Sequence, residues 1–227
     1  MKTLSLVIPA YNAPDLARTA ASHIPELAAA ATACGFELVE AIFVDDGSEP
    51  PLDLPQADGA TAIPIKVLRQ PANRGKGAAV RRGALSAKGG WVLMSDVDLS
   101  APLTEFSRLA SHADAWMVCG SRRGRAGMPL CRRILSRLFH AFAWLAGARG
   151  IRDTQCGFKL FRMDAMRPVF EAQRIERFAF DVELIRRVLR ARGAVVEVPV
   201  AWHGGRRSSL RVMRDAPRML RDLLRLG

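Results

Sequence analysis

The chain has 227 residues, of which 49% are hydrophobic, and its formal net charge is +12. This length and apolar content suffice for a large α/β domain with a real core, and they exclude a disordered or low-complexity chain. The positive charge predicts a polyanionic partner, such as a phosphorylated substrate or an anionic membrane surface. With one tyrosine and no aromatic RNA-binding motif, we expect no nucleic-acid partner.

Apolar runs and helical segments alternate along the chain. An alanine-rich helix is predicted from about Pro14 to Ala33, stopping at Gly35, and a second helix follows Gly77 and ends near Gly89. Strands are predicted at Leu4–Ile8, Val39–Val44, Ile65–Leu68, Trp91–Met94 and Trp116–Cys119. This alternation predicts a mostly parallel sheet covered by helices on both faces, in a single domain spanning residues 1–227.

The four cysteines are scattered, with no C-x-x-C pair, which is typical of reduced thiols in a cytoplasmic protein. The first residues enter an apolar strand at once, so we expect no signal peptide. No run approaches the roughly 18 apolar residues of a transmembrane helix. We therefore expect a cytoplasmic protein that meets a membrane only by lying on it.

Polar side chains follow three of the predicted strands: Tyr11 and Asn12, then Asp45 and Asp46, then Asp96 and Asp98. The carboxyl ends of parallel strands lie along one edge of a sheet, so we expect the three sets to line one crevice. Asp96 and Asp98 point the same way, and two carboxylates this close favour a hard cation, Mg²⁺ or Mn²⁺, between them. In the alternative interpretation, Asp98 caps the next helix and Asp96 is a solvated strand end.

Six stretches resemble a known family. LVIPAYN (6–12), VDDGS (44–48) and SDVD (95–98) resemble the family 2 glycosyltransferases of the GT-A fold. NRGKGAAVR (73–81) and DTQCGFKLF (153–161) are similar to the dolichyl-phosphate β-glucosyltransferases of that family and, next, to the dolichol-phosphate mannose synthases. RFAFDVEL (177–184) favours the glucosyl branch.

The resemblance implies inverting transfer of a sugar, above all glucose from UDP-glucose rather than mannose from GDP-mannose, to a polyprenyl phosphate. Ala13 stands where many relatives have Glu, and Ser100 stands where the mannose synthases often have Gln. Both departures concern the identity of the donor. Residues 73–77, at the N-terminus of the second predicted helix, could attract an anion, and this would place Lys76 near the donor. The implied metal ligands are Asp96 and Asp98, and the donor-binding residues are Pro9, Ala10, Tyr11, Asn12, Asp45, Asp46, Lys76, Asp96, Val97 and Asp98.

Inverting transfer is a single displacement, in which the enzyme stabilises the leaving diphosphate and aims the nucleophile. A phosphate acceptor, with a second pKa of about 6, is already ionised and needs cations rather than a general base. Arginine suits this task, although a solvated basic face is the alternative. The resemblance to the mannose synthases implies that Ser121, Arg122, Arg132 and Ser136 bind the acceptor phosphate, and we add Gln155, Lys159, Arg206 and Arg207 to this predicted set. The predicted catalytic residues are Asp96, Asp98, Arg122 and Arg132.

Three acidic residues allow more than one role. Asp153 is a further catalytic candidate, but it could be a base, a lysine partner or a structural cap. Asp181 and Glu183 stand at a predicted helix start, where the helix dipole alone favours acidic residues. The four histidines do not cluster at metal-ligand spacing.

Residues 129–149 and 210–227 are predicted to form basic amphipathic helices at the membrane interface. Amphipathic helices packed on the sheet are the alternative. The charge favours peripheral contact with the inner face of the membrane, where a membrane-protein partner or a second copy of the chain could join. Three other functions stay open: a glycosyltransferase with a hydroxyl acceptor on another lipid or a polysaccharide, a nucleotidyltransferase, and a non-catalytic nucleotide-sugar binder.

Overall fold

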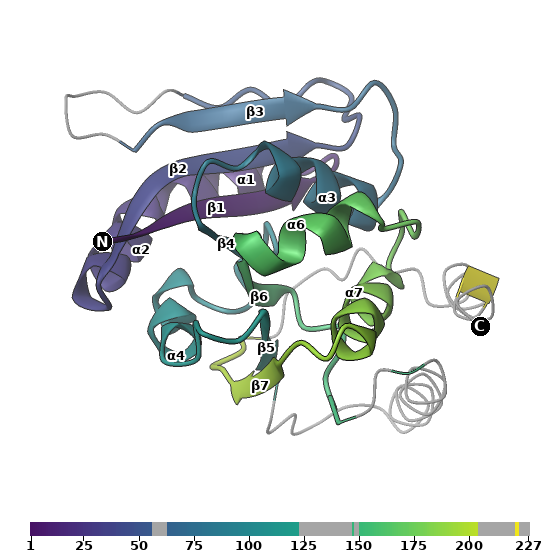
Figure 1. The fold of residues 1–227 in the computed structure, drawn as a ribbon. Coiled ribbons are helices and arrows are strands. Elements are labelled where there is room, and N and C mark those ends of the chain that lie inside the picture. Colours follow the sequence, from purple (N-terminus) through teal and green to yellow (C-terminus); the bar gives the residue numbers. More distant parts are fainter. Residues whose placement is uncertain (56–62, 123–146, 148–149, 204–220, 223–227) are drawn as a thin grey trace.

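The computed structural model describes residues 1–55, 63–122, 147, 150–203 and 221–222 (Figure 1). A seven-stranded sheet runs through the described part of the chain, in the strand order β3-β2-β1-β4-β6-β5-β7. The strands are β1 (Lys2–Ala10), β2 (Phe36–Asp45), β3 (Ile65–Arg69), β4 (Trp91–Ser95), β5 (Met117–Ser121), β6 (Phe158–Arg162) and β7 (Val195–Pro199).

The sheet is mostly parallel, as predicted. The pairs β1–β2, β1–β4, β2–β3 and β5–β7 are parallel, and the two antiparallel pairs are both made by β6. Strands β6 and β7 were not predicted, and β6 inserts between β4 and β5, which are consecutive strands in the chain. Its insertion depends on long-range pairing, so no local pattern indicates it.

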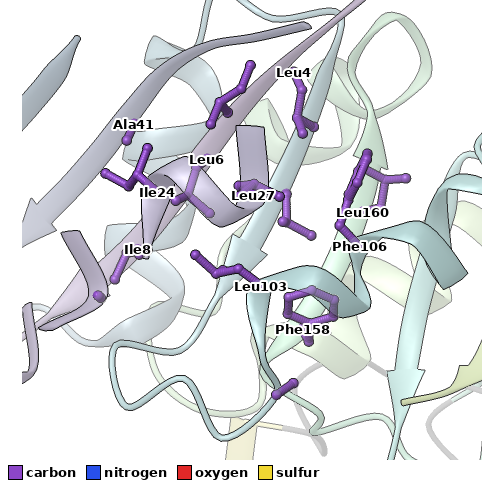
Figure 2. Close-up of a cluster of buried hydrophobic side chains, with 14 of the residues drawn as sticks. Leu4, Leu6, Ile8, Ile24, Leu27, Ala41, Leu103, Phe106, Phe158 and Leu160 are labelled. Atoms are coloured by element: carbon purple, nitrogen blue, oxygen red, sulfur yellow. The ribbon is translucent and has the colours of Figure 1, made fainter. Parts of the chain in front are cut away.

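Helices cover both faces of the sheet (Figure 1). Alternate residues of β1 point to opposite faces, so Leu4, Leu6 and Ile8 enter one core and Val7 enters the other. Figure 2 shows the first core, in which the β1 leucines lie near Leu27 of a covering helix. This face carries α1 (Pro14–Ser22), α2 (Ile24–Ala33), η1 (Leu103–Glu105) and α4 (Phe106–Ala110), and the other carries α3 (Lys76–Ser86), α6 (Met163–Glu171) and α7 (Phe180–Arg190).

The single helix predicted over about residues 14–33 is instead two helices. α1 ends at Ser22, α2 begins at Ile24, and His23 between them has φ −92° and ψ 1°. Pro25 is the physical reason, because it has no N–H to donate and its ring clashes with the carbonyl four residues earlier. The predicted stop at Gly35 is confirmed by its left-handed φ of +77°.

The membrane-facing segments predicted at 129–149 and 210–227 lie outside the described residues, apart from positions 147, 221 and 222. Among the helices that the structure describes, none combines the length and apolar character that crossing a bilayer requires.

Candidate active site

The carboxyl ends of β2, β1 and β4 lie side by side at one edge of the sheet. Ala10 pairs in register with Asp45, and the amide of Asp46 donates a 2.9 Å hydrogen bond to the Ala10 carbonyl. On the other side of β1, β4 runs parallel and ends at Ser95, immediately before Asp96. Three polar strand ends that are distant in sequence therefore meet at one edge.

Asp45 closes the VDDGS turn. Its Oδ1 accepts from the Ser48 amide at 2.8 Å, and its Oδ2 accepts from the Leu52 amide at 3.1 Å and from Arg69 Nη1 at 2.8 Å. Burial raises the pKa of Asp45, but hydrogen bonds from Ser48 and Leu52 and the Arg69 charge outweigh it, so the pKa lies below its usual value. Asp45 is thus a carboxylate that fixes the shape of the strand end.

Asp46 fixes the loop that leads into α3. Its Oδ1 accepts from Gln70 Nε2 at 2.6 Å and from the Arg74 amide at 2.8 Å. Its Oδ2 accepts from Asn73 Nδ2 at 3.0 Å and from the Gly75 amide at 2.8 Å. Burial is the main influence on this carboxyl group and raises its pKa, against the opposing hydrogen bonds. The start of α3 is therefore tied to the end of β2.

Tyr11 and Asn12 occupy the end of β1, beyond the buried residues Pro9 and Ala10. The Tyr11 side chain is 50% exposed, which leaves its ring open to a ligand at this edge. Asn12 has a φ of 48° and is hydrogen-bonded to the VDDGS turn and the residue after it. Its amide donates to Ser48 Oγ at 2.9 Å, and its Oδ1 accepts from the Glu49 amide at 3.0 Å.

The two carboxylates of the SDVD motif follow β4. The Asp96 amide donates to the Gly157 carbonyl at 2.9 Å, and its Oδ1 lies 2.6 Å from Lys76 Nζ. Asp98 Oδ1 accepts from the Ser100 amide at 3.0 Å, and Val97 between them packs on the core. Asp98 does not cap the helix that follows, because the residue before η1 is Pro102.

The chemistry of this carboxylate pair fits a hard divalent cation. Mg²⁺ and Mn²⁺ prefer oxygen ligands and are commonly held by one or two carboxylates together with phosphate oxygens. In the part of the chain that the structure describes, no group of three or more His, Cys, Asp or Glu side chains comes together as a metal cage. Asp96 and Asp98 could therefore hold a cation whose other ligands come from a bound diphosphate and water.

Arg122 and Asp153 form a bidentate pair beyond the end of β5. Asp153 Oδ2 accepts from the Arg122 amide at 2.9 Å and from Nε at 2.7 Å, and Oδ1 accepts from Nη2 at 2.5 Å. Burial raises the pKa of Asp153, but the hydrogen bonds and charge of Arg122 outweigh it and hold the pKa below its usual value. An arginine, not a lysine, is its partner, and this pairing favours a positioning role over that of a general base.

Lys159 and Asp181 form an ion pair inside the fold. Lys159 is fully buried on β6, its Nζ lies 2.9 Å from Asp181 Oδ1 on α7, and it also donates to the Cys156 carbonyl. Burial lowers the pKa of Lys159, but the Asp181 carboxylate outweighs it and raises the pKa above its usual value. This ammonium points into the core, so we leave Lys159 out of the phosphate-binding groups proposed below.

The remaining predicted residues have the following places. Gln155 Nε2 donates to the Phe178 carbonyl at 2.9 Å, and Ser121 is buried at the end of β5. Glu183 lies in the first turn of α7, as expected, and accepts from the Arg174 and Ile175 amides. The predicted acceptor-phosphate residues Arg132, Ser136, Arg206 and Arg207 lie outside the described residues.

Comparison with known proteins decides the family. The sequence model of the family described as "Glycosyl transferase family 2" matches residues 5–170. The chain belongs to glycosyltransferase family 2. The resemblance seen in the sequence motifs is thereby confirmed.

Relatives of this glycosyltransferase share most of its length. It is 32% identical to the dolichyl-phosphate β-glucosyltransferase of Dictyostelium discoideum, over 98% of this chain and 73% of that protein. It is 36% identical to dolichyl-phosphate β-glucosyltransferase ALG5C of Trichomonas vaginalis, over 88% of this chain and 63% of that protein. The human protein of the same name is 32% identical, over 88% of this chain and 67% of its own length.

Solved structures confirm the GT-A fold of this glycosyltransferase. Glucosyl-3-phosphoglycerate synthase from Mycobacterium tuberculosis, in complex with Mn²⁺, UDP and glucosyl-3-phosphoglycerate, has a TM-score of 0.71 at 18% identity, over 99% of this chain and 78% of that one. Mannosyl-3-phosphoglycerate synthase from Rubrobacter xylanophilus has a TM-score of 0.68 at 20% identity, over 99% of this chain and 72% of that one. At these identities the likeness shows the fold alone.

The contacts that hold Asp46 and Asp96 in the candidate site were not predicted. Gln70 and Asn73 hold Asp46, Lys76 meets Asp96, and Gly157 lies against Asp96. The position of Asn73 and Lys76 just before a predicted helix was the one available signal. Gly157 stands in a recognised motif, but its partner lies 61 positions away in the sequence (157 − 96), beyond the reach of any local pattern.

Gly157→Ala is expected to lower sugar transfer about a hundredfold, because a misplaced reacting group costs that much. A Cβ at Gly157 would lie 1.8 Å from Asp96 Oδ2 and 2.1 Å from its Cγ, so the carboxylate must move. The free energy of unfolding is expected to change by only about 1 kcal/mol, since the displaced group is a side-chain end. Gly90→Ala is the matched control, because the nearest atom to its added Cβ is 3.6 Å away. Equal activity of the two variants would contradict the placement of Asp96.

Asp153→Asn is expected to raise the KM for the acceptor about tenfold and to leave kcat largely intact, because it loosens Arg122 without removing a base. Steady-state kinetics over a range of acceptor concentrations measures both values. The control is Asp164→Asn, which disturbs an exposed Arg–Asp pair, since Asp164 Oδ1 lies 2.9 Å from Arg162 Nε. A fall in kcat of about 10²–10⁴-fold would instead identify Asp153 as the general base.

Proposed function

We propose that this chain transfers a sugar from a nucleotide-sugar donor to a polyprenyl phosphate, with inversion at the anomeric carbon. The observation that carries the proposal is similarity over 98% of the chain to a relative named dolichyl-phosphate β-glucosyltransferase. The site is compatible with it, because Asp153, a carboxylate considered as a base, is bound to Arg122 through both oxygens. A phosphate acceptor needs no base, since it is already ionised near neutral pH.

The donor in this proposal is UDP-glucose rather than GDP-mannose. The names of the relatives support glucose, and the UDP bound by the Mycobacterium synthase of the same fold supports a uridine nucleotide. The exposed Tyr11 ring would lie against the nucleoside, at the strand end that Asn12, Asp45 and Asp46 hold in place. Lys76, at the start of α3, would meet the diphosphate.

Asp96 and Asp98 would hold Mg²⁺ or Mn²⁺. Structures of the same fold that contain Mn²⁺ or Mg²⁺ with UDP support this proposal. When bound, the cation supplies positive charge to the leaving diphosphate. The chain's own contribution is to hold both carboxylates at the sheet edge. The Asp96 amide donates a hydrogen bond to the Gly157 carbonyl, and the Ser100 amide donates one to Asp98 Oδ1.

Arg122 would bind the acceptor phosphate. A guanidinium has five N–H donors, and Asp153 takes two of them, which leaves three for a phosphate. The Trp202 ring, with its centroid 5.9 Å from the guanidinium carbon, adds a second constraint on its position. Arg132, Ser136, Arg206 and Arg207 complete the phosphate site as a prediction from the sequence.

We also propose that residues 1–227 form a single domain that works at the inner, cytoplasmic face of a membrane. One sheet takes strands from Lys2 through Pro199, which supports a single domain. The net charge of +12 suits an anionic surface. The predicted amphipathic segments at 129–149 and 210–227 would make the contact.

The test is transfer of label into lipid. Purified protein is incubated with Mg²⁺ or Mn²⁺, a polyprenyl phosphate in detergent and each of several radiolabelled nucleotide sugars, and the lipid is extracted into organic solvent. We expect label from UDP-glucose, lost when EDTA removes the metal. Label from GDP-mannose alone would overturn the donor assignment. Donor binding without lipid label from any sugar would overturn the acceptor.

A further inference from the structure

Lys76 is a cation in an unfavourable place. It is the first residue of α3, where the positive end of the helix dipole disfavours an ammonium. The first turn of α3 carries no acidic residue, and its N-cap is Gly75, which has no side chain. Asp96, with Oδ1 2.6 Å from Lys76 Nζ, supplies the compensating charge from another part of the chain.

The backbone beside Lys76 is fixed on both sides. Gly75, at φ +113°, donates to Asp46, and a Cβ there would lie 2.7 Å from the Glu176 carbonyl oxygen. A Cβ at Gly77 would lie 2.7 Å from the Phe180 Cβ. These contacts hold the backbone at the start of α3, and the flexible part of the ion pair on this side is the Lys76 side chain.

The ammonium lies against an oxygen that the proposed cation would use. Mg²⁺ binds carboxylate oxygens at about 2.0–2.1 Å, so an ammonium on the same oxygen opposes it by charge and by space. The Lys76 side chain is 18% exposed and that of Asp96 is 38% exposed, which limits screening by water. A divalent ion that takes Asp96 Oδ1 as a ligand must therefore displace Lys76 from that oxygen.

We propose that Lys76 is an internal cation that occupies Asp96 before the substrates arrive, and that the metal ion displaces its ammonium onto the donor diphosphate. This inference rests on the proposed function, from which it takes the metal ion and the diphosphate. Lys76 thereby couples the two ligands: the metal alone must break an ion pair, whereas with the nucleotide present the ammonium gains a new partner. The coupling is reciprocal, so each ligand raises affinity for the other.

Two affinities of Lys76→Met should change in opposite directions. Without nucleotide, Mn²⁺ should bind about tenfold more tightly than in the wild type, because the competing cation is gone. With Mn²⁺ saturating, UDP should bind about tenfold more weakly, because the diphosphate has lost a charge partner. Electron paramagnetic resonance of free Mn²⁺ measures the first affinity, and calorimetric titration of UDP measures the second. Neither readout requires turnover.

Lys66→Met and Lys76→Arg are the controls. Lys66 makes a comparable ion pair, with Nζ 2.5 Å from Glu40 Oε2, on β3 away from the SDVD motif. Its variant has the same net charge as Lys76→Met and should bind Mn²⁺ like the wild type. Lys76→Arg keeps the competing cation and should not gain Mn²⁺ affinity. Thermal melts of all variants establish that they are folded.

The outcomes separate this inference from the function on which it rests. Asp98→Ala should abolish Mn²⁺ binding. If it does, and Lys76→Met binds Mn²⁺ no more tightly than the wild type, the displacement is wrong while the metal site stands. If a folded Lys76→Met binds Mn²⁺ more weakly, Lys76 supports Asp96 rather than competing for it, and the inference is again overturned. If Asp98→Ala binds Mn²⁺ like the wild type, the proposed metal site itself fails, and the inference fails with it.

Discussion

Asp98→Ala is expected to lower the rate of sugar transfer about 10³-fold, because it removes one of the two carboxylates proposed to hold the metal that neutralises the leaving diphosphate. The fold should change little, since the one described bond that is lost is the 3.0 Å hydrogen bond from the Ser100 amide. That loss is worth about 0.5–1.5 kcal/mol. Initial rates across a Mg²⁺ titration measure the effect, and urea denaturation measures the stability.

Asp15→Ala is the matched control for this variant. Asp15 also makes one polar side-chain contact, 3.3 Å from Arg18 Nη1, but it lies on the exposed surface of α1. Its transfer rate should equal that of the wild type. If Asp98→Ala retained a tenth or more of the wild-type rate with unchanged Mg²⁺ dependence, the carboxylate pair would not be the metal site.

Lys159→Met is expected to reduce the free energy of unfolding by about 3–5 kcal/mol, because it leaves the Asp181 carboxylate buried without its partner. Both side chains are almost wholly enclosed: Lys159 is 0% exposed and Asp181 is 2% exposed. When one partner of a surface ion pair is removed, water solvates the charge that remains. Water does not reach the Asp181 carboxylate in this way, because it is buried. Urea denaturation followed by circular dichroism measures the loss.

The double variant Lys159→Met/Asp181→Leu should recover most of that stability, because it removes the unpaired charge as well. A double variant no more stable than Lys159→Met would contradict the proposed cost of burying Asp181 alone. The same protein tests the acceptor role predicted from the sequence. If the double variant is stable and binds the donor normally but has lost affinity for polyprenyl phosphate, Lys159 binds the acceptor. If its affinity for polyprenyl phosphate is normal, the role of the pair is confined to the core.

The order of strands and helices could be predicted for the first half of the fold, because apolar runs give β1 to β5 and helices follow β1, β3 and β4. The position of β6 could not, since it depends on antiparallel pairing of Phe158–Arg162 with β4 and β5, which precede it in the chain. The break at His23 could have been predicted from Pro25, whose missing N–H ends a helix. The high alanine content of residues 14–33 instead favoured the prediction of one continuous helix.

The site was predictable where it rests on strand ends, because register alone brings Ala10 beside Asp45. It was not predictable where side chains from distant segments meet. The contact of Lys76 with Asp96 and the bidentate bond of Arg122 with Asp153 join residues 20 and 31 positions apart (96 − 76 and 153 − 122). No spacing rule for a helix or a strand relates such pairs, so the roles of Lys76 and Asp153 depend on the folded structure.

A phosphate is the proposed nucleophile, and two acceptors that differ only at this group can distinguish it from a hydroxyl. A polyprenyl phosphate and the polyprenol of the same chain length differ only in that group. Each is incubated with the protein, Mg²⁺ and radiolabelled UDP-glucose, and the label in the extracted lipid is counted. We predict label in the phosphate lipid and none in the alcohol. Label in the alcohol at a comparable rate would contradict the claim and identify a hydroxyl acceptor.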